Sequence, residues 1–382
     1  MKQLYITHAA AINPLGSSLE EIWQNIIKGA VAYGKATLPG DRNFFVAETI
    51  PGTGSDIAAY APLFSNTIRR LVNQLNIIDP VDAIFFASAV GNLAELEHEI
   101  YSDRPIALEQ LNFASVEHIF ADTSAYGKNT QFVCVPTGCC AGLQAIGLAK
   151  NIMYRLGFKR ALIMSLDFGL TPLALEAFNK INATCSFDPN LTTSPSRPFC
   201  LDRHGFLFAD GGGAILVSTE TPEHSVPRIS GYGCVSSAYH MTNISTDGVS
   251  IRQSIELALK DAGVKGEEID HVNLHASGTQ QNDQAEYQAL KDVIGTKLPT
   301  VTTFKGNHGH ALGGANIIEV ALAWKMMITG MLPPTAQDLP VDAYQDIPLR
   351  SQASPFQSRV MLKTASGFSG IHASMIMEND NV

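Results

Sequence analysis

Short apolar runs, rich in β-branched residues, alternate with helical patterns through the first half of the chain. Runs of this kind, separated by helices, indicate strands of a mostly parallel sheet that is covered on both faces. Segment 17–29 begins with serines, carries glutamates in its first turn and ends in glycine, as an amphipathic helix does. The first half is therefore predicted to be α/β, with strands at 4–12, 83–90, 131–137, 160–168 and 213–219.

The same alternation starts again after the polar stretch 219–227, which contains two prolines. Helices are predicted at 250–264 and 315–330, between further short apolar runs. Because the second half repeats the pattern of the first, we predict two similar halves, residues 1–222 and residues 223–382. The strands predicted for the second half are 228–237, 271–276, 300–304, 359–368 and 372–378.

Composition narrows the class of protein. The 382 residues are 45% hydrophobic and carry a formal net charge of −10 with no block of like charge, which argues against a nucleic-acid partner. Six cysteines without framework spacing suggest free thiols in a reducing compartment, so a cytoplasmic location is expected. The apolar run 4–16 is interrupted by His8, Asn13 and Pro14, and no stretch approaches the roughly 18 apolar residues of a membrane span.

The segment VPTGCCAGLQAIGLAKNIM, residues 135–153, places two cysteines between a strand and a helix. A thiol at Cys139 would feel the positive end of the helix dipole, which lowers its pKa and favours the reactive thiolate. Cys139 is therefore a candidate nucleophile. Adjacent cysteines in an apolar turn are also ordinary buried small residues, and this stretch alone favours that interpretation; Cys140 is assigned to the core.

A second candidate segment, 272–286, delivers His275 from a strand end into a polar loop followed by Asp283. Ligand sites in open α/β sheets form at such strand ends, and the hydroxyls of Ser277 and Thr279 are suited to a polar substrate arm. A histidine that merely caps the core explains the segment equally well.

A third segment, 302–319, carries Lys305, His308 and His310 in a glycine-rich loop, followed by a helix with Glu319. The simpler interpretation is that Lys305 and one histidine are solvated loop residues, and we assign His308 to solvent. His310 lies closer to the following helix.

A fourth segment, 365–374, surrounds Phe368 with small residues. Small residues allow a backbone N–H to approach a substrate closely, as an oxyanion hole requires. A plain glycine-rich hairpin between the last two strands is the alternative. Taken alone, each of the four segments is explained at least about as well by its simpler interpretation as by a catalytic role. Their joint occurrence, in this order and at these separations, favours the catalytic role.

With these four segments, the chain resembles a β-ketoacyl-acyl-carrier-protein synthase of the Cys-His-His type, a condensing enzyme of the thiolase-like superfamily. The resemblance spans essentially the whole chain. It includes the opening segment INPLGSSLEEIWQNIIKG (12–29), the central segment SRPFCLDRHGFLFADGGGAILV (196–217) and the segment SSAYHMT (236–242) near the start of the second half. The family's nucleophile motif falls on Thr137, Gly138, Cys139 and Gly142, its first histidine motif on His275, Thr279 and Asp283, and its lysine-histidine-glutamate set on Lys305, His310 and Glu319.

The sequence departs from the family pattern at several positions. Gly138 stands where alanine is usual, and Ile371 and His372 stand where threonine and asparagine are common. Ser277 replaces a threonine, and Gln280 stands where a proline usually occurs. These changes and the somewhat short chain concern substrate choice more than chemistry. They are more typical of a specialised bacterial type II synthase, for example from aryl-polyene assembly, than of a housekeeping fatty-acid enzyme.

The resemblance implies an α/β, thiolase-like five-layer αβαβα fold made of two similar halves, and it implies the roles of the central residues. Cys139 would accept an acyl group from a carrier-protein pantetheine arm, with the backbone N–H groups of Cys139 and Phe368 holding the oxyanion. A malonyl thioester would then lose carbon dioxide while neutral His275 and His310 stabilise its enolate. Decarboxylative Claisen condensation is the reaction expected.

The resemblance also implies supporting residues and partners. Lys305 and Glu319 would orient His310 and its loop, and neither a metal nor a cofactor is expected beyond the pantetheine of acyl carrier protein. The family pairs its first-half sheets across a two-fold axis, so a dimer is expected, of identical chains or with a nucleophile-less homologue. The pantetheine arm would contact Thr242, Ser277 and Thr279.

Three alternatives remain open at this point. A non-catalytic chain-length-factor-like subunit shares the fold but characteristically lacks the nucleophile. A degradative thiolase would need a second cysteine in the C-terminal half, where Cys234 alone is present and stands outside a plausible motif. A structural metal site would use the set Cys139, Cys140, His308 and His310, but a Cys-Cys pair lacks the usual two-residue spacer.

Overall fold

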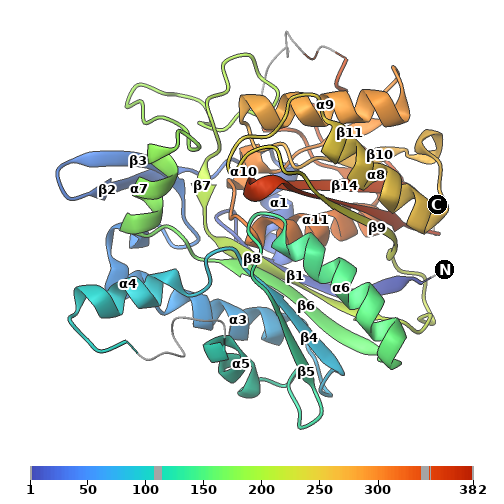
Figure 1. Ribbon diagram of the computed structural model, residues 1–382, viewed down its shortest axis with the longest axis horizontal. Coiled ribbons are helices and arrows are strands. Elements are labelled where there is room, and N and C mark those ends of the chain that lie inside the picture. Colours follow the sequence, from blue (N-terminus) through green and yellow to red (C-terminus); the bar gives the residue numbers. More distant parts are fainter. Residues whose placement is uncertain (1, 107–113, 337–343, 345, 381–382) are drawn as a thin grey trace.

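The centre of the fold is one ten-stranded sheet, which the computed structural model shows in the order β11-β10-β14-β15-β9-β1-β8-β6-β4-β5 (Figure 1). The structure describes residues 2–106, 114–336, 344 and 346–380. One side of the sheet holds β1 (Leu4–Ile12), β4 (Ala83–Ala87), β5 (Gln131–Val135), β6 (Arg160–Asp167) and β8 (Gly211–Ser218). The other side holds β9 (Arg228–Ser236), β10 (His271–Asn273), β11 (Thr300–Thr302), β14 (Val360–Gly367) and β15 (Ile371–Glu378).

Helices cover both faces of each side of the sheet. Between the two sides lie α6 (Ala141–Leu156), which packs against β4 and β6 and also against β9 and β15, and α11 (Gly314–Thr329), which packs against α6, β1, β6 and β8. The outer faces are covered by α3 (Leu63–Gln74) on β1, β6 and β8, and by α8 (Val249–Ala262) on β9, β14 and β15. This is the five-layer αβαβα arrangement, so the predicted fold class is confirmed.

The strand sequences explain why both faces are covered. Along β4 and β6 the odd-numbered residues, such as Phe85 and Ile163, belong to the core that contains α6 and α11. The even-numbered Phe86 and Leu162 belong to the core beneath α3. Because successive side chains of a strand point to opposite faces, a strand that is apolar at every position must be buried on both.

Two glycines allow the central layer to pack closely. A Cβ atom at Gly142 of α6 would lie 2.7 Å from Cβ of Asn316 in α11. A Cβ atom at Gly213 of β8 would lie 2.6 Å from the backbone of Ile317. Real Cβ atoms do not approach that closely, so both positions require glycine for α11 to lie against α6 and β8. This close packing brings the start of α6 next to the start of α11.

The predicted strands are present, but the sheet is mixed and not mostly parallel as expected. It is parallel at both ends, where β5, β4 and β6 pair and where β11, β10 and β14 pair. The central pairs, from β14 to β6, are antiparallel. The prediction was wrong there because the three-residue turn 368–370 joins β14 directly to β15 as a hairpin, which forces an antiparallel pair.

Several elements were not predicted from the sequence. A small sheet forms from β2 (Gly34–Leu38), β3 (Arg42–Ala47) and the two-residue β7 (Phe208–Ala209). Helices beyond those predicted are α2 (Ile57–Tyr60), α3, α4 (Leu93–Tyr101), α5 (Ala114–Ala121), α7 (Pro172–Lys180), α9 (Gln280–Ile294) and α10 (Lys305–His308). Within the described residues, no helix has both the length and the apolar character needed to cross a bilayer.

Candidate active site

The loop between β5 and α6 carries the candidate nucleophile. Gly138 has a φ of 92°, a value that glycine adopts without strain, and Cys140 is the N-cap residue of α6. Cys139 between them is partly exposed, whereas Cys140 is fully buried and its Sγ donates to the carbonyl oxygen of Ile371 at 3.2 Å. The prediction that Cys140 is a core residue is therefore confirmed.

The pKa of Cys139 differs from the sequence expectation. Burial raises the pKa of the Cys139 thiol to about 12, and the carboxylate of Asp167 acts in the same direction. Lys305 and the backbone N–H groups of Phe368 and Cys139 favour the thiolate, but they do not offset the loss of hydration. The predicted lowering of this pKa was wrong because the helix-dipole argument ignores how much water the surrounding chain removes from the sulfur.

A consequence is expected in the reactivity of the free enzyme. Below a pKa of about 12, the thiolate fraction of Cys139 rises about tenfold for each pH unit. The rate of iodoacetamide alkylation at Cys139 should therefore rise with a slope of one in a log-rate plot from about pH 6 to about pH 9. Peptide mapping at each pH checks this, and a plateau near neutral pH would contradict it.

The hairpin between β14 and β15 lies against the nucleophile. A Cβ atom built at Gly367 would be 3.5 Å from both N and Cβ of Cys139, so the two segments are in van der Waals contact. The backbone N–H of Phe368 lies close enough to the Cys139 sulfur to lower its pKa. An N–H donor therefore lies beside the candidate nucleophile.

The two candidate histidines face each other across the cavity that contains Cys139. The ring centroids of His275 and His310 are 5.1 Å apart, with the rings nearly perpendicular at 82°. Burial, followed by the positive charge of Lys305, holds the pKa of both imidazoles well below its ordinary value, so both rings are neutral. Their Nδ1 atoms are buried without a partner among the described residues. The cavity is lined by Cys139, Phe206, Ile244, His275, Ser277, Thr279, His310, Ser366, Gly367 and Phe368.

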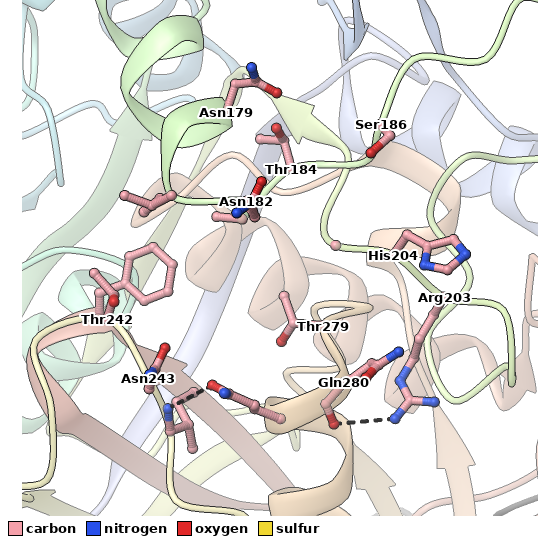
Figure 2. A pocket seen from close by; sticks show the side chains of 16 residues that line it. Asn179, Asn182, Thr184, Ser186, Arg203, His204, Thr242, Asn243, Thr279 and Gln280 are labelled. Atoms are coloured by element: carbon pink, nitrogen blue, oxygen red, sulfur yellow. Dashed lines mark hydrogen bonds between the residues drawn. The ribbon is translucent and has the colours of Figure 1, made fainter.

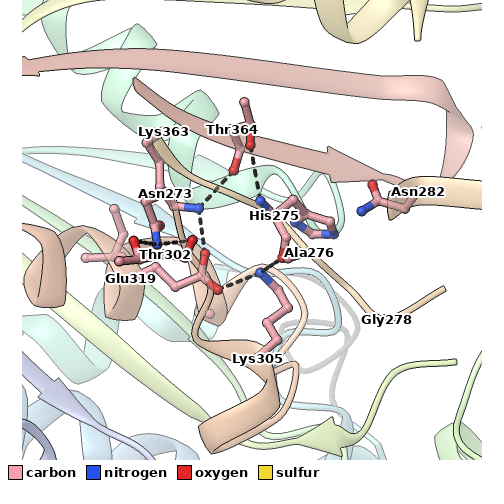
Figure 3. Close-up of polar contacts among 12 residues, drawn as sticks. Asn273, His275, Ala276, Gly278, Asn282, Thr302, Lys305, Glu319, Lys363 and Thr364 are labelled. Carbon is pink, nitrogen blue, oxygen red and sulfur yellow. Dashed lines mark hydrogen bonds and ion pairs between the residues drawn. The ribbon is translucent and has the colours of Figure 1, made fainter. Parts of the chain in front are cut away.

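Lys305 lies against the main chain of His275 (Figure 3). Its Nζ donates to the carbonyl oxygen of His275 at 2.6 Å and to Oε1 of Glu319 at 2.5 Å, with both charged side chains fully buried. The sequence prediction placed Lys305 and Glu319 as orienting residues of His310. The structure adds a contact that was not predicted, the hydrogen bond to the main chain of the other histidine, while the charge of Lys305 also acts on His310.

The opposite side of the His275 peptide is held by residues that the sequence analysis missed. Glu286 of α9 accepts from the backbone N–H of His275 at 2.9 Å and of Ala276 at 2.7 Å. Thr364 of β14 accepts from the N–H of His275 at 3.1 Å and donates to Glu286 at 2.6 Å. His275 is thus gripped at its N–H and at its carbonyl, which fixes the direction of its ring.

Lys363 is a third residue that the sequence analysis missed. Its Nζ lies 2.6 Å from Oε2 of Glu319 and donates to the carbonyl of Thr364 at 2.8 Å, and its side chain has no exposed surface (Figure 3). A charged residue inside the apolar strand VMLKTASG was the available signal. Such residues are almost never fully buried unless they are paired.

His308 is not solvated, contrary to the prediction. It is fully buried, its ring stacks on Phe304 at 6.5 Å between centroids, and burial lowers its pKa to about 4. Lys305 is likewise buried. The residues 305–308 form the short helix α10 and not an open loop, with Ser194 donating to the carbonyl of Gly306 at 3.2 Å. No group of three metal-ligating side chains is found among the described residues.

A wider pocket adjoins this cavity, and Figure 2 shows the side chains that line the wider pocket. It has a volume of about 480 Å³ and shares Ile244, Thr279 and Phe368 with the inner cavity. Thr242 and Thr279 both line it, while Ser277 lines only the inner cavity and its hydroxyl lies 2.9 Å from the Thr279 hydroxyl. The three predicted contacts therefore follow one path from the surface toward Cys139.

The segment after His275 is ordered by buried ion pairing. Thr279 is the N-cap residue of α9 and accepts from the N–H of Asn282. Asp283 lies 3.3 Å from Nε of Arg203 and accepts from the N–H of Phe199 at 2.8 Å. Burial raises the pKa of Asp283 to about 6. Asp283 is thus a structural anchor of the loop and lines neither pocket.

The five-layer fold, with a thiol and two neutral imidazoles at one cavity, is the arrangement expected of the β-ketoacyl synthase class. Residues 226–337 match the family described as beta-ketoacyl synthase, C-terminal domain. A polyketide beta-ketoacyl synthase 1 of Streptomyces halstedii is 31% identical over 314 residues, covering 76% of this chain and 73% of that protein. The 3-oxoacyl-[acyl-carrier-protein] synthase 2 of Synechocystis is 27% identical over 417 residues, covering 98% and 97%. This chain belongs to the β-ketoacyl synthase family, whose members are acyltransferases.

Solved structures show the same fold. A chain from the complex of a type II polyketide ketosynthase with its acyl carrier protein superposes with a TM-score of 0.87 at 24% identity, over 99% of both chains. A chain from the complex of a ketosynthase with its chain length factor, from Xenorhabdus doucetiae, superposes with a TM-score of 0.79 at 19% identity, over 99% of this chain and 98% of that one.

Proposed function

We propose that this chain is a catalytic β-ketoacyl-acyl-carrier-protein synthase that performs a decarboxylative Claisen condensation. The observation that carries the proposal is the shared cavity: the Cys139 thiol, the rings of His275 and His310 and the N–H side of Phe368 all border it. A covalent carrier, two neutral hydrogen-bond donors for an enolate and an oxyanion hole are the parts that this reaction needs.

In the first half-reaction, an acyl thioester on the pantetheine arm of a carrier protein enters through the outer pocket past Thr242 and Thr279. The Cys139 sulfur attacks the thioester carbonyl, and the N–H groups of Cys139 and Phe368 hold the oxyanion. The carbon–sulfur bond to pantetheine then breaks, and the departing thiolate takes up the proton that Cys139 loses. Because burial raises the pKa of the resting thiol, a neutral imidazole that borders the same cavity serves as the base that carries this proton in transit.

In the second half-reaction, a malonyl thioester occupies the cavity beside acylated Cys139. Its carbon–carbon bond to the carboxylate breaks, carbon dioxide leaves, and the electron pair forms an enolate whose oxygen accepts from the rings of His275 and His310. The carbanion attacks the Cys139 thioester, a new carbon–carbon bond forms, and the Cys139 sulfur leaves as a thiolate that takes a proton from water entering through the outer pocket. The thiol and the imidazoles supply each role, so the mechanism calls for no metal or resident cofactor.

Partners and location complete the proposal. The carrier-protein complex of the similar ketosynthase supports an acyl carrier protein as partner. The strand β5 ends the central sheet with Phe132 and Val133 only partly buried, which supports a dimer that pairs this edge with an identical or homologous chain. Sedimentation of the active protein tests that assembly.

The six free cysteines support a location in the cytoplasm. The pathway, aryl-polyene assembly or another, stays a prediction.

The experiment that tests the function offers a panel of acyl-carrier thioesters to the purified protein, followed by malonyl carrier protein. Intact mass should show one acyl group retained on Cys139, and its mass identifies the preferred chain length. Carbon dioxide release should then accompany the appearance of the β-ketoacyl product. If the protein accepts no acyl group and releases no carbon dioxide, but restores activity to a second ketosynthase, it is the non-catalytic subunit.

A further inference from the structure

Lys363 occupies an unusual position for a charged residue. It lies inside β14, between Asn273 of β10 and Met375 of β15 in the sheet register, and its side chain is fully buried. Its Nζ forms an ion pair with Glu319 at 2.6 Å and donates to the carbonyl of Thr364 at 2.8 Å. A buried ammonium group is costly unless it is paired, so a lysine at this position calls for a reason.

The two oxygens of Glu319 are shared between two lysines. Lys305 contacts Oε1 and Lys363 contacts Oε2, and all three side chains are at most 1% exposed. The remaining charged group that acts on Lys363 is the carboxylate of Glu286 from α9. Two lysines and two carboxylates make this buried cluster neutral, and they alternate in the order Lys305, Glu319, Lys363, Glu286.

The cluster surrounds the peptide of His275. Lys305 holds its carbonyl oxygen, and Glu286 and Thr364 hold its N–H. Glu319 can hold Lys305 in place without Lys363, but the cluster would then carry a net charge of −1. That charge would lie beside the cavity in which the enolate acquires its own negative charge.

We propose that Lys363 is a positioning and charge-balancing residue for the decarboxylation step, a role that rests on the function proposed above. It shares Glu319 with Lys305, and so keeps the support of His275 electrically neutral where an enolate must form. Lys363 touches no substrate and lines neither pocket. Its positive charge also reaches both imidazoles, because it is among the causes that lower the pKa of His275 and of His310.

The test compares Lys363→Met with Lys363→Arg and with a matched control, Lys150→Met. Lys150 is also a buried lysine, paired with Asp261 and donating to the carbonyl of Ser230 at 2.5 Å, but it has no contact with the site. For each variant, kcat and KM for carbon dioxide release from malonyl carrier protein are measured, together with acyl-enzyme formation by intact mass.

In Lys363→Met, kcat for decarboxylation should fall about tenfold, as expected for a unit charge on the order of 10 Å away at an effective dielectric constant of about 20. KM and acyl-enzyme formation should change by less than about twofold, because neither the entrance nor Cys139 contacts Lys363. Lys363→Arg should recover most of the loss, since it keeps the charge, and Lys150→Met should retain the original kcat.

A charge-matched double variant, Lys363→Met with Glu319→Gln, separates electrostatics from packing. It returns the cluster to neutrality, so kcat should recover at least about threefold over Lys363→Met alone. An unchanged kcat in Lys363→Met, equal losses in both half-reactions, or no recovery in the double variant would overturn the proposal. If the unmodified protein itself releases no carbon dioxide, the proposed function fails and the role of Lys363 fails with it, whereas an unmodified protein that decarboxylates beside an unaffected Lys363→Met overturns the role of Lys363 alone.

Discussion

Replacing Cys139 with serine is expected to abolish acyl-enzyme formation, while Cys140→Ser leaves it nearly intact. The Cys139 sulfur borders the cavity and lies near the N–H of Phe368, whereas the Cys140 sulfur points into the core toward the carbonyl of Ile371. A serine hydroxyl is a far weaker nucleophile than a thiolate, and loss of the nucleophile from a covalent enzyme costs on the order of 10⁴-fold or more.

Intact mass after incubation with an acyl-carrier thioester measures this directly. Cys139→Ser should show no added acyl mass, and Cys140→Ser should acylate at a rate within about threefold of the original, since a small polar side chain can keep the hydrogen bond to Ile371. Thermal unfolding of both variants confirms that each is folded. Acylation that persists in Cys139→Ser and disappears in Cys140→Ser would reverse the assignment.

The order of the main strands could be predicted from the sequence, because these strands are buried on both faces and therefore read as mostly apolar runs. The run 4–12 coincides with β1, and 160–168 ends one residue beyond β6, since each run is mostly apolar. The small sheet of β2, β3 and β7 was missed for the opposite reason. Its strands are short, and β7 has only two residues, so no periodic pattern can mark it.

The candidate site was only partly predictable. The resemblance identified Cys139, His275 and His310, and the structure brings them to one cavity. It could not show that Lys305 contacts the backbone of His275, because a hydrogen bond to a carbonyl leaves no trace in residue spacing. For the same reason the sequence did not reveal Glu286, which accepts from main-chain N–H groups eleven and ten residues away.

Two errors share one physical cause, which is desolvation. His308 was assigned to solvent because glycine-rich loops are usually exposed, yet it is fully buried. The pKa of Cys139 was expected to fall because of the helix dipole, yet burial raises it. Sequence patterns identify a helix start or a loop, but they do not show which other segments cover it. Here the hairpin of Gly367 and Phe368 lies over Cys139.

Replacing either histidine is expected to separate the two half-reactions. His275→Ala and His310→Ala should each reduce decarboxylation of malonyl carrier protein by roughly 10² to 10³, the usual effect of losing one donor to a developing oxyanion. The enolate has the two imidazoles as its stabilisers in this cavity. Acyl transfer to Cys139 should fall by less than about tenfold, because each single variant keeps one imidazole to accept the thiol proton.

The alanine substitution at His275 removes the ring without removing the hydrogen bonds that hold the main chain. In His275→Ala the main-chain contacts to Lys305, Glu286 and Thr364 remain, since all three contact backbone atoms of residue 275, and only the ring is lost. A matched control is His308→Leu. His308 is buried nearby with neither ring nitrogen partnered among the described residues, so replacing it removes no hydrogen bond within that part of the chain. Its decarboxylation rate should stay within about fivefold of the original.

Two assays on each variant measure the effect: acyl-enzyme formation by intact mass, and carbon dioxide release from malonyl carrier protein. The N–H groups of Cys139 and Phe368 stabilise the oxyanion of acyl transfer, whereas the two imidazole rings stabilise the enolate. Only the rate of carbon dioxide release should therefore fall strongly. If His275→Ala and His310→Ala both decarboxylate at the original rate, the enolate is stabilised elsewhere and the mechanism is wrong. A large loss in His308→Leu alone would move the assignment to that third, buried imidazole.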